Sequence, residues 1–460
     1  MTKGVVIAGL GGGAGKSVVA VGLAAALRER GDSVVPFKKG PDYIDAGWLG
    51  EAAGAPCFHL DPYLMEDETI VQAFINHCQG RDYAVIEGNR GLFDGVDSAG
   101  TYSTAELATL LGLPVLLVVD CTKTTRTVAA MVYGCCHFSP GFDIKGVILN
   151  RIGSNRHEKV IREAVEEYTS VPVLGALERM PRDVFPMRHL GVTPFQEYAG
   201  VEETVAELAE KVESSCDLER IKESMADSSA EKKGFRRLYS RTNISKDVRI
   251  GVIRDEAFQF YYPDNILALE ERGAEIVTLN ALTDRELPVL DGLYIGGGFP
   301  ETSARDLSVN LSFRESLKQW ARKGLPVYAE CGGLIYLGES IILEEGEFPL
   351  TGVFPVKFSL EAKPQAHGYT VLRALNGNPF YEEGTVIRGH EFRYSRIAAW
   401  SGKTQTMSFS VERGVGLAEK RDGLSYRNVL ALYTHIHALA TPEWAEGLVE
   451  KARQFKNSNG

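Results

Sequence analysis

A single cysteine in the segment VYAECGGLIYL, residues 327–337, has the surroundings of a catalytic nucleophile. An apolar run typical of a strand precedes Cys331, and two glycines and an amphipathic helical pattern follow it. A strand–turn–helix of this kind exposes its central side chain, and a helix N-terminus stabilises a thiolate. Most cysteines are small buried hydrophobic residues. The glycines on this turn nevertheless favour nucleophilic catalysis by Cys331.

Such a nucleophile needs a base, and the segment LALYTHIHALA offers His435 and His437. If the segment is a strand, the two histidines share a face because they are two residues apart. They could also form a metal pair, but no second cluster in the sequence completes a ligand set. GGGFPE, residues 296–301, follows another predicted strand, and the amides of Gly297 and Gly298 are suited to stabilising an oxyanion.

A phosphate-binding loop is predicted by GLGGGAGKSVV, which follows the first predicted strand and opens the first predicted helix. Backbone amides and the helix N-terminus would bind phosphate, Lys16 would add a positive charge, and the Ser17 hydroxyl would ligate Mg²⁺. The strict G-x-x-x-x-G-K-[ST] pattern requires glycine where this chain has Leu10. A plain glycine-rich turn is the alternative, but GKS directly after a strand favours a nucleotide site. The predicted loop residues are Gly11, Gly12, Gly13, Gly15, Lys16 and Ser17.

Acidic residues follow neighbouring strands of the same predicted sheet. Glu87 closes the apolar strand YAVIEG, and ligands of open parallel sheets sit at the C-terminal ends of the strands. Asp42 and Asp45 lie in KKGPDYID, and Asp94 lies in NRGLFDG. A single loop aspartate is usually a turn-forming residue. Two such loops beside one sheet favour a metal and substrate site instead.

The elements that must position these residues form two α/β runs. Apolar β-branched segments alternate with helical patterns in the first half, which predicts a parallel sheet with helical crossovers. A polar, serine-rich stretch around residues 214–247 indicates a tail helix and a linker. A second α/β run follows, and after residue 345 strand patterns predominate. We therefore expect domains over residues 1–225 and 248–460, joined by a linker over 226–247.

Composition restricts the class of protein. The chain has 460 residues, a formal net charge of −11 and 44% hydrophobic residues, which is typical of a globular protein and argues against nucleic-acid binding. Its seven cysteines include no C-x-x-C pair, which favours reduced thiols. The N-terminus enters a strand directly, and no apolar stretch approaches the length of a membrane span. We expect a cytoplasmic protein without a membrane partner.

Ten segments together resemble the cobyrinic acid a,c-diamide synthase family, a group of ATP- and glutamine-dependent tetrapyrrole amidotransferases. The resemblance covers nearly the whole chain. The segments are IAGLGGGAGKS, PFKKGPDYID, VIEGNRGLFDG, GVILNRIGSNRH, RHLGV, RDEAFQFYYPDN, GGGFPE, VYAECGGLIYL, GHEFRYS and YTHIH.

The resemblance implies a fold and a reaction. The N-terminal half is similar to the P-loop ATP domain of dethiobiotin synthetase, a group that also lacks the first glycine. The C-terminal half is similar to a class I glutamine amidotransferase whose third triad member is missing, with Cys331 as nucleophile and His435 as base. The implied enzyme is a carbon–nitrogen ligase that uses ATP and Mg²⁺ to activate carboxylates as acyl phosphates. Glutamine supplies the ammonia.

The resemblance also implies roles for residues of the ATP domain. Lys16, Ser17 and Glu87 match phosphate and Mg²⁺ groups, and Asn150 matches a position near the nucleotide base. Asp45 and Asp94 match residues that support activation of the substrate. The residues that match tetrapyrrole-placing groups are Asp42, Tyr43, Ile44, Asp45 and Asp94. The implied partners are small molecules, namely tetrapyrrole, glutamine and ATP, and the family arrangement is compatible with a homodimer.

Two loops depart from the family pattern. Lys39 stands where an apolar residue is commoner, and Arg90 lies in a loop that is usually apolar. Lys123 and Arg126 add cations after the next strand. These cations either bind a carboxylate-rich tetrapyrrole such as siroheme, or pair with Asp94, Asp97 or Glu87 and shape the loops.

The substrate and the class of protein therefore stay open on sequence grounds. Cobyrinic acid is the family default, siroheme is an alternative, and Ni-sirohydrochlorin is a third. A non-catalytic, nucleotide-dependent tetrapyrrole carrier is the alternative from a different class. The intact Lys16, Cys331 and His435 argue against it, because a carrier has no use for the cysteine–histidine pair.

Overall fold

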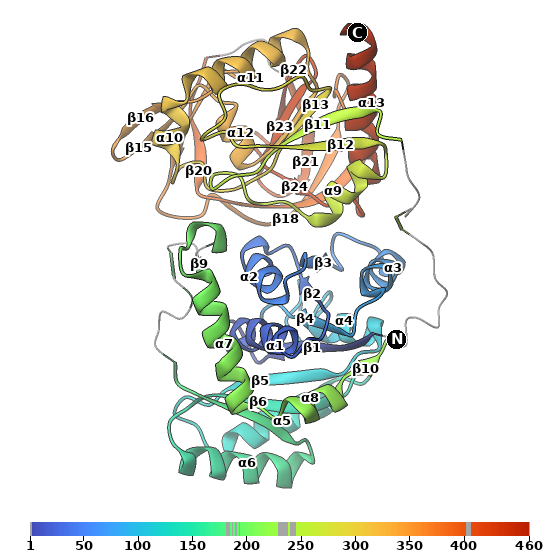
Figure 1. The fold of residues 1–460 in the computed structure, drawn as a ribbon, viewed down its shortest axis with the longest axis vertical. Coiled ribbons are helices and arrows are strands. Elements are labelled where there is room, and N and C mark those ends of the chain that lie inside the picture. The colour runs from blue at the N-terminus through green and yellow to red at the C-terminus, as the bar shows by residue number, and fades with distance from the viewer. Residues whose placement is uncertain are drawn as a thin grey trace. The chain divides into compact units, whose positions relative to one another are not determined.

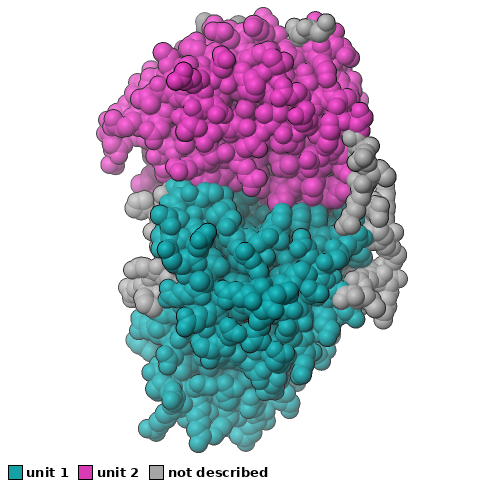
Figure 2. All heavy atoms as spheres, viewed as in Figure 1, with its two compact units in different colours: residues 1–238 teal, residues 239–460 magenta. Residues whose placement is uncertain are grey.

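In a computed structural model the chain divides into two compact units, Met1–Leu238 and Tyr239–Gly460 (Figure 2). The predicted linker over 226–247 falls largely on residues outside the description, and its bounds stay a prediction. The structure describes residues 2–459 except 181–184, 186, 189–190, 193, 229–237, 240–244 and 402–405.

The first unit is built on a parallel sheet with helices packed on it (Figure 1). The strand order is β3 (Phe58–Leu60), β2 (Val34–Lys39), β4 (Tyr83–Glu87), β1 (Lys3–Gly9), β5 (Val115–Asp120), β6 (Ile144–Ile152) and β7 (Val173–Glu178). Strand β10 (Ala226–Asp227) pairs antiparallel with β1. The β-branched residues at the centre of these strands are buried, as their apolar runs predicted.

Helices of the first unit follow the strands in sequence. Helix α1 packs against α2 and α7, and α5 packs against α6. The helices are α1 (Lys16–Glu29), α2 (Tyr43–Ala53), α3 (Asp67–Cys78), α4 (Thr104–Leu111), α5 (Thr127–Phe138), α6 (Asn155–Thr169), α7 (Val201–Ser215) and α8 (Leu218–Ser224). A short ribbon of β8 (Met187–Arg188) and β9 (Gly191–Val192) and the 3₁₀ turn η1 (Phe195–Glu197) precede α7.

The second unit contains a mixed sheet with a parallel part and an antiparallel part. Its order is β12 (Ala274–Leu279), β11 (Val248–Ile253), β13 (Gly292–Ile295), β14 (Val327–Glu330), β23 (Val429–Leu432), β22 (Arg421–Tyr426), β21 (Thr406–Arg413), β18 (Ala366–Ala374), β19 (Val386–Arg393) and β24 (His435–Ile436). The first five strands run parallel, and the others pair antiparallel.

A smaller sheet and several helices complete the second unit. The sheet consists of β16 (Gly346–Pro349), β15 (Ser340–Leu343), β17 (Val356–Leu360) and β20 (Ser395–Trp400). The helices are α9 (Pro263–Glu270), α10 (Ala304–Val309), α11 (Leu311–Lys323), α12 (Gly332–Tyr336) and α13 (Pro442–Asn459). The prediction of two α/β units, the second richer in strands after residue 345, is confirmed.

Candidate active sites

The predicted phosphate-binding loop lies between β1 and α1. Gly15, the residue before α1, has a left-handed backbone with φ +97°. A Cβ at Gly15 would lie 2.1 Å from Nδ2 of Asn150, so both conformation and space require glycine there. Lys16 Nζ donates to the carbonyl of Gly11 at 3.0 Å, and burial lowers the pKa of Lys16. The lysine thus folds back along the loop, as expected of a phosphate-binding group.

Asn150 near the end of β6 contacts this loop directly. Its Nδ2 donates to the carbonyl of Ala14 at 2.9 Å, and its Oδ1 accepts from the Arg151 amide at 2.9 Å. The side chain is buried. The resemblance placed Asn150 near a nucleotide base, and the contact to Ala14 gives it a second role in holding the loop.

A cluster of one lysine and two carboxylates lies beside the loop, with Lys38 and Glu87 buried and Asp45 partly exposed. Lys38 Nζ is 2.7 Å from Asp45 Oδ2 and 3.0 Å from Glu87 Oε1. Ser17 Oγ donates to the same Glu87 oxygen at 2.7 Å. Burial alone would lower the pKa of Lys38, but Asp45 and Glu87 outweigh it and raise that pKa. Lys38 is therefore charged, and it joins β2, β4 and the start of α2.

The strand register explains this cluster. Lys38 lies directly opposite Glu87 in the parallel pairing of β2 with β4, and Ile7 of β1 lies on the other side of Glu87. The sequence analysis had singled out Lys39 and passed over Lys38. Adjacent residues of a strand point to opposite faces. Only the register shows which lysine of the pair meets Glu87.

The cluster fits a magnesium ion. The Ser17 hydroxyl and the Glu87 carboxylate lie next to each other, and oxygen donors of this kind suit Mg²⁺. Glu87 Oε2 is buried and has no hydrogen-bond partner within the described part of the chain. Burial raises the pKa of Glu87, an effect that a nearby cation would oppose.

The predicted substrate residues gather at the start of α2. Asp42 is the N-cap of this helix, where its Oδ1 accepts from the amides of Ile44 at 2.9 Å and Asp45 at 3.1 Å. The carbonyl of Asp42 contacts His59 Nε2 at 3.0 Å, and the Tyr43 ring lies 5.8 Å from the His59 ring. His59, which the sequence analysis did not select, thus supports this turn.

The additional cations do not pair as one sequence alternative suggested. Neither Lys39 nor Arg90 forms an ion pair with Asp94, Asp97 or Glu87 among the described residues. Lys39 is buried, and burial lowers its pKa, with Asp61 opposing and Arg90 adding to this effect. Arg90 is exposed and has a left-handed φ of +54°.

Among the residues that the structure describes, the Asp94 loop and the cations Lys123 and Arg126 do not contact one another in the way the sequence alternative suggested. Asp94 is exposed and accepts from the Gly91 amide at 2.8 Å. Arg126 donates to Tyr168 of α6 at 2.5 Å and lies 4.8 Å from the centroid of its ring. Lys123 is exposed. Arg126 is thus directed to α6 and not to the Asp94 loop.

In the second unit Cys331 lies on the predicted strand–turn–helix between β14 and α12. Its backbone has φ +47° and ψ −97°, a conformation that costs a non-glycine residue about 1–3 kcal/mol. The Cys331 amide donates to the Leu432 carbonyl at 2.8 Å, and the Ile335 amide donates to the Cys331 carbonyl at 3.0 Å. These bonds hold the turn in its strained conformation. Cys331 itself is buried, with 7% of its surface exposed, so the expectation from the sequence that the turn exposes this side chain is wrong.

His435 of β24 lies at this turn and is buried. Burial alone would lower its pKa, but hydrogen bonding to Cys331 and Glu330 raises the pKa to about 9. Nδ1 of His435 lies 3.4 Å from Oε2 of Glu330. The resemblance implied that a third triad member is missing. Ile436 and His437 do occupy the usual positions, but the carboxylate of Glu330 reaches His435 from β14.

The two histidines of the H-x-H pair have different neighbours. His437 Nε2 lies 3.6 Å from Asp264 Oδ2, and the His437 ring lies 4.5 Å from that of Tyr262. His435 stacks on His390 of β19, with ring centroids 4.9 Å apart. Sequence reasoning missed His390 and Glu330, since each is far from His435 in the chain.

The predicted oxyanion loop lies against the histidine. A Cβ at Gly297 would be 2.3 Å from Cε1 of His435, and a Cβ at Gly332 would be 3.0 Å from the Gly298 amide nitrogen. The Gly297 carbonyl accepts from the amides of Gln259 and Phe260, each at 3.0 Å. The loop is therefore fixed within reach of the Cys331 turn.

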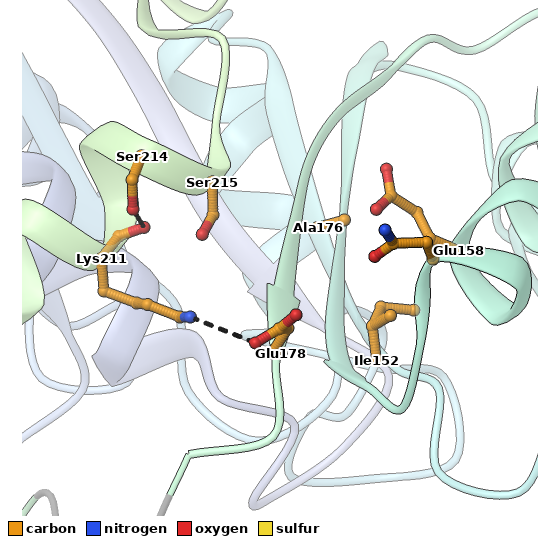
Figure 3. Close-up of a pocket in the computed structure, with 8 residues that line it drawn as sticks. Ile152, Glu158, Ala176, Glu178, Lys211, Ser214 and Ser215 are labelled. Atoms are coloured by element: carbon orange, nitrogen blue, oxygen red, sulfur yellow. Dashed lines mark hydrogen bonds and ion pairs between the residues drawn. The ribbon is translucent and has the colours of Figure 1, made fainter.

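A separate groove in the first unit holds none of the predicted site residues. The groove has a volume of about 350 Å³. Figure 3 shows the side chains that line it, including the ion pair of Lys211 with Glu178. Lys211 Nζ lies 3.9 Å from Glu178 Oε2. The groove is lined by Ile152, Asn155, Glu158, Ala176, Glu178, Lys211, Ser214 and Ser215. The candidate sites are defined by side-chain clusters and not by this groove.

Comparisons with known proteins match both units. A model described as the CobQ/CobB/MinD/ParA nucleotide binding domain matches residues 5–189. A model described as the CobB/CobQ-like glutamine amidotransferase domain matches residues 249–443. No helix in the described residues is long and apolar enough to cross a membrane.

Several relatives that match over nearly the whole chain carry the same name. A cobyrinate a,c-diamide synthase of Magnetococcus marinus is 41% identical, covering 96% of this chain and 95% of that protein. Its namesake in Archaeoglobus fulgidus is also 41% identical, with 98% of each chain covered. The one in Methanosphaera stadtmanae is 36% identical, with 99% of this chain and 100% of that protein covered.

Proposed function

This chain belongs to the cobyrinate a,c-diamide synthase family, and we propose that it converts two peripheral carboxylates, a and c, of cobyrinic acid into amides with ATP and glutamine. One observation supports this proposal most. A single chain combines a phosphate-binding loop beside a buried Lys38–Glu87 pair with a cysteine–histidine pair on a strained turn. The first arrangement suits phosphoryl transfer, and the second suits glutamine hydrolysis.

In the glutaminase step, Cys331 Sγ attacks the side-chain amide carbon of glutamine. The amides of Gly297 and Gly298 stabilise the oxyanion, and protonated His435 gives its proton to the leaving nitrogen, which departs as ammonia. Water then attacks the thioester carbon, and the carbon–sulfur bond breaks to release glutamate and restore the thiol.

In the synthetase step, a substrate carboxylate oxygen takes the γ-phosphoryl group of ATP, and ADP leaves. Ammonia then attacks the acyl carbon, the bond to the phosphate oxygen breaks, and inorganic phosphate leaves with an amide as product. Lys16 binds the phosphates, and Ser17 and Glu87 would hold Mg²⁺, which supplies charge neutralisation when bound. Lys38 keeps Glu87 and Asp45 in place.

The residues of the α2 turn and the Asp94 loop are proposed to place the tetrapyrrole. Asp45 forms an ion pair with Lys38. Asp94 lies on an exposed loop, and its carboxylate accepts a hydrogen bond from the Gly91 amide of the same loop. Asp42, Tyr43 and Ile44 form the first turn of α2, which presents backbone and side chains at the same edge of the sheet as Glu87.

A second candidate substrate, siroheme, is favoured by Lys39 and Arg90. Lys39 is a buried cation without an ion-pair partner in the described part of the chain, and Arg90 is a near neighbour of like charge. Two such cations are suited to an additional substrate carboxylate. Offering cobyrinic acid and siroheme in competition, with product masses as readout, separates the two substrates.

A nitrogen-source experiment tests the overall proposal. Cys331→Ala should lose glutamine-dependent amidation while ammonium chloride still supports it, because ammonia bypasses the glutaminase. Cys136→Ala, on the half-exposed face of α5, is the matched control and should keep both activities. A non-catalytic carrier would give no amide with either nitrogen source, and that result would refute the proposal.

A further inference from the structure

A buried carboxylate directly precedes the proposed nucleophile. Glu330 is the last residue of β14, and its side chain is 0% exposed. Removing a carboxylate from water is costly unless nearby groups compensate its charge. The neighbours of Glu330 therefore show which state of this carboxylate the fold stabilises.

Each contact of Glu330 is made with a donor group. Tyr294 Oη donates to Oε2 at 3.2 Å, and the Ile436 amide donates to Oε1 at 3.4 Å. His435 Nδ1 lies 3.4 Å from Oε2. An ionised carboxylate only accepts hydrogen bonds, so this set of neighbours matches an ionised Glu330 and a protonated Nδ1. Burial outweighs these three partners and raises the pKa of Glu330, although the contacts with His435, Ile436 and Tyr294 each lower it.

The groups around Glu330 are themselves held in place. Asn265 Nδ2 donates to the Ile436 carbonyl at 3.0 Å and to Tyr294 Oη at 3.3 Å. Asn265 Oδ1 accepts from the Ala438 amide at 2.7 Å. The buried Asn265 side chain thus connects β24 to Tyr294, which contacts the Glu330 carboxylate. These contacts fix the orientation of Glu330 toward His435.

We propose that Glu330 is the positioning residue of the glutaminase and holds the His435 ring with Nδ1 protonated and Nε2 directed to Cys331. The carboxylate thereby replaces the glutamate of the H-P-E arrangement, from a different position in the chain. It also stabilises the imidazolium that forms when His435 takes the thiol proton. This inference rests on the glutaminase part of the proposed function and is independent of the tetrapyrrole.

Among the described residues, the titratable groups that face His435 include Glu330 on β14, Cys331 on the turn after it, and His390 on β19, whose Nδ1 lies 3.3 Å from Tyr262 Oη. Of these groups, only Glu330 contributes a carboxylate. Replacing it with glutamine removes the negative charge and keeps the shape.

Glu330→Gln in the full chain tests the proposal. We expect kcat for glutamine hydrolysis to fall by about 100-fold or more, with KM changed less than about threefold. The rate of Cys331 alkylation by iodoacetamide is measured at several pH values by mass spectrometry of the peptide that contains Cys331. The midpoint of this pH profile should lie at higher pH in Glu330→Gln than in wild type, because a less basic His435 stabilises the thiolate less. Glu339→Gln, at an exposed glutamate of the same unit, is the matched control and should behave as wild type.

Two further readouts keep the outcomes distinct. Ammonia-dependent amidation should be unchanged in Glu330→Gln, so its loss together with glutamine hydrolysis would indicate general damage and overturn the positioning role. A Glu330→Gln variant with the same kcat and the same alkylation midpoint as wild type would also overturn the positioning role. If Glu330→Gln does not fold, Glu330→Asp decides, because it keeps the charge but shortens the reach. We expect about a tenfold lower kcat there, and a wild-type value would contradict the proposal.

If neither glutamine hydrolysis nor alkylation of Cys331 occurs in the wild-type chain, the glutaminase part of the proposed function fails. Hydrolysis that is present and independent of Glu330 defeats only the positioning role. The two failures are therefore distinguishable.

Discussion

Lys38 Nζ lies 3.0 Å from Glu87 Oε1 across two adjacent parallel strands, and both side chains are buried. The same ammonium group lies 2.7 Å from Asp45 at the start of α2. One cation therefore holds the carboxylate expected to ligate Mg²⁺ and a carboxylate expected to support substrate activation. Lys38 therefore links the carboxylate beside the predicted phosphate-binding loop to the first turn of α2, where the substrate is predicted to bind.

Replacing Lys38 should disable ATP chemistry and destabilise the first unit. In Lys38→Met the buried Glu87 and the partly exposed Asp45 lose their cation, and breaking a buried pair such as Lys38–Glu87 costs about 3–5 kcal/mol of unfolding free energy. ADP formation should fall by about 100-fold, while glutamine hydrolysis in the second unit persists. Urea denaturation and ADP release measure the two effects.

Lys145→Met is the control for that substitution. Lys145 pairs with Asp143 at 3.0 Å, but both side chains are mostly exposed. Such a pair contributes less than about 1 kcal/mol. Equal effects of the two substitutions, or wild-type ADP formation in Lys38→Met, would contradict the role given to Lys38.

The His435 imidazole should titrate at unusually high pH. Hydrogen bonding to Cys331 and Glu330 overcomes burial and raises the pKa of His435 to about 9. Because the folded-state pKa exceeds the unfolded value of about 6.5, the associated stability is complete below pH 6.5 and is lost as pH rises through 9.

NMR of labelled histidine, assigned with His435→Gln, measures this pKa. In Cys331→Ala the hydrogen-bond partner of His435 is absent, so the pKa of His435 should fall toward its usual value. A wild-type midpoint near 6.5 would show that the Cys331 and Glu330 contacts do not stabilise the imidazolium.

Adding a methyl group at Gly297 should displace His435, the proposed catalytic base. The new Cβ in Gly297→Ala would lie 2.3 Å from Cε1 of His435, so glutamine hydrolysis should fall by about 100-fold with ammonia-dependent activity intact. Gly292→Ala, on β13 of the same unit, has 3.5 Å of space and is the control. Assays with glutamine and with ammonium chloride make the comparison, and normal glutamine hydrolysis in Gly297→Ala would argue against this site.

The two loop cations should affect substrate choice. Removing them in Lys39→Val/Arg90→Val should lower the kcat/KM ratio of siroheme to cobyrinic acid about tenfold, since a charge-assisted hydrogen bond contributes about 1.5–3 kcal/mol. Arg126→Met is the control, because Arg126 is directed to Tyr168. Competition assays with both tetrapyrroles measure the ratio. An unchanged ratio would reduce Lys39 and Arg90 to loop-shaping residues.

The local structure around the candidate groups within continuous segments was predictable from the sequence. The loop from Gly11 to Ser17 and the turn at Cys331 each place their groups within one strand–turn–helix, so residue type and spacing define them. Glu87 was predictable because it ends an apolar strand. The parallel sheets followed from the apolar runs in the same way.

Contacts between distant segments were not predictable. Glu330 and His435 meet because β14 and β24 converge in the fold, although the residues are 105 positions apart. Lys38 and Lys39 are equivalent in sequence pattern, and only the pairing of β2 with β4 directs Lys38 to Glu87. Strand register and tertiary approach decide such pairs, and neither is encoded in a local motif.

The most direct test of the central claim is the mass of cobyrinic acid after incubation with the wild-type chain, ATP, Mg²⁺ and glutamine. Replacing hydroxyl by amino lowers the mass by about one unit at each site, so two amidations lower it by about two units. Glutamine labelled with ¹⁵N in its side-chain amide should raise the product mass by about one unit for each nitrogen transferred. This account predicts both shifts in the wild type and neither with glutamine in Cys331→Ala. An unchanged tetrapyrrole mass in the wild type, with ATP and glutamine consumed, would contradict it.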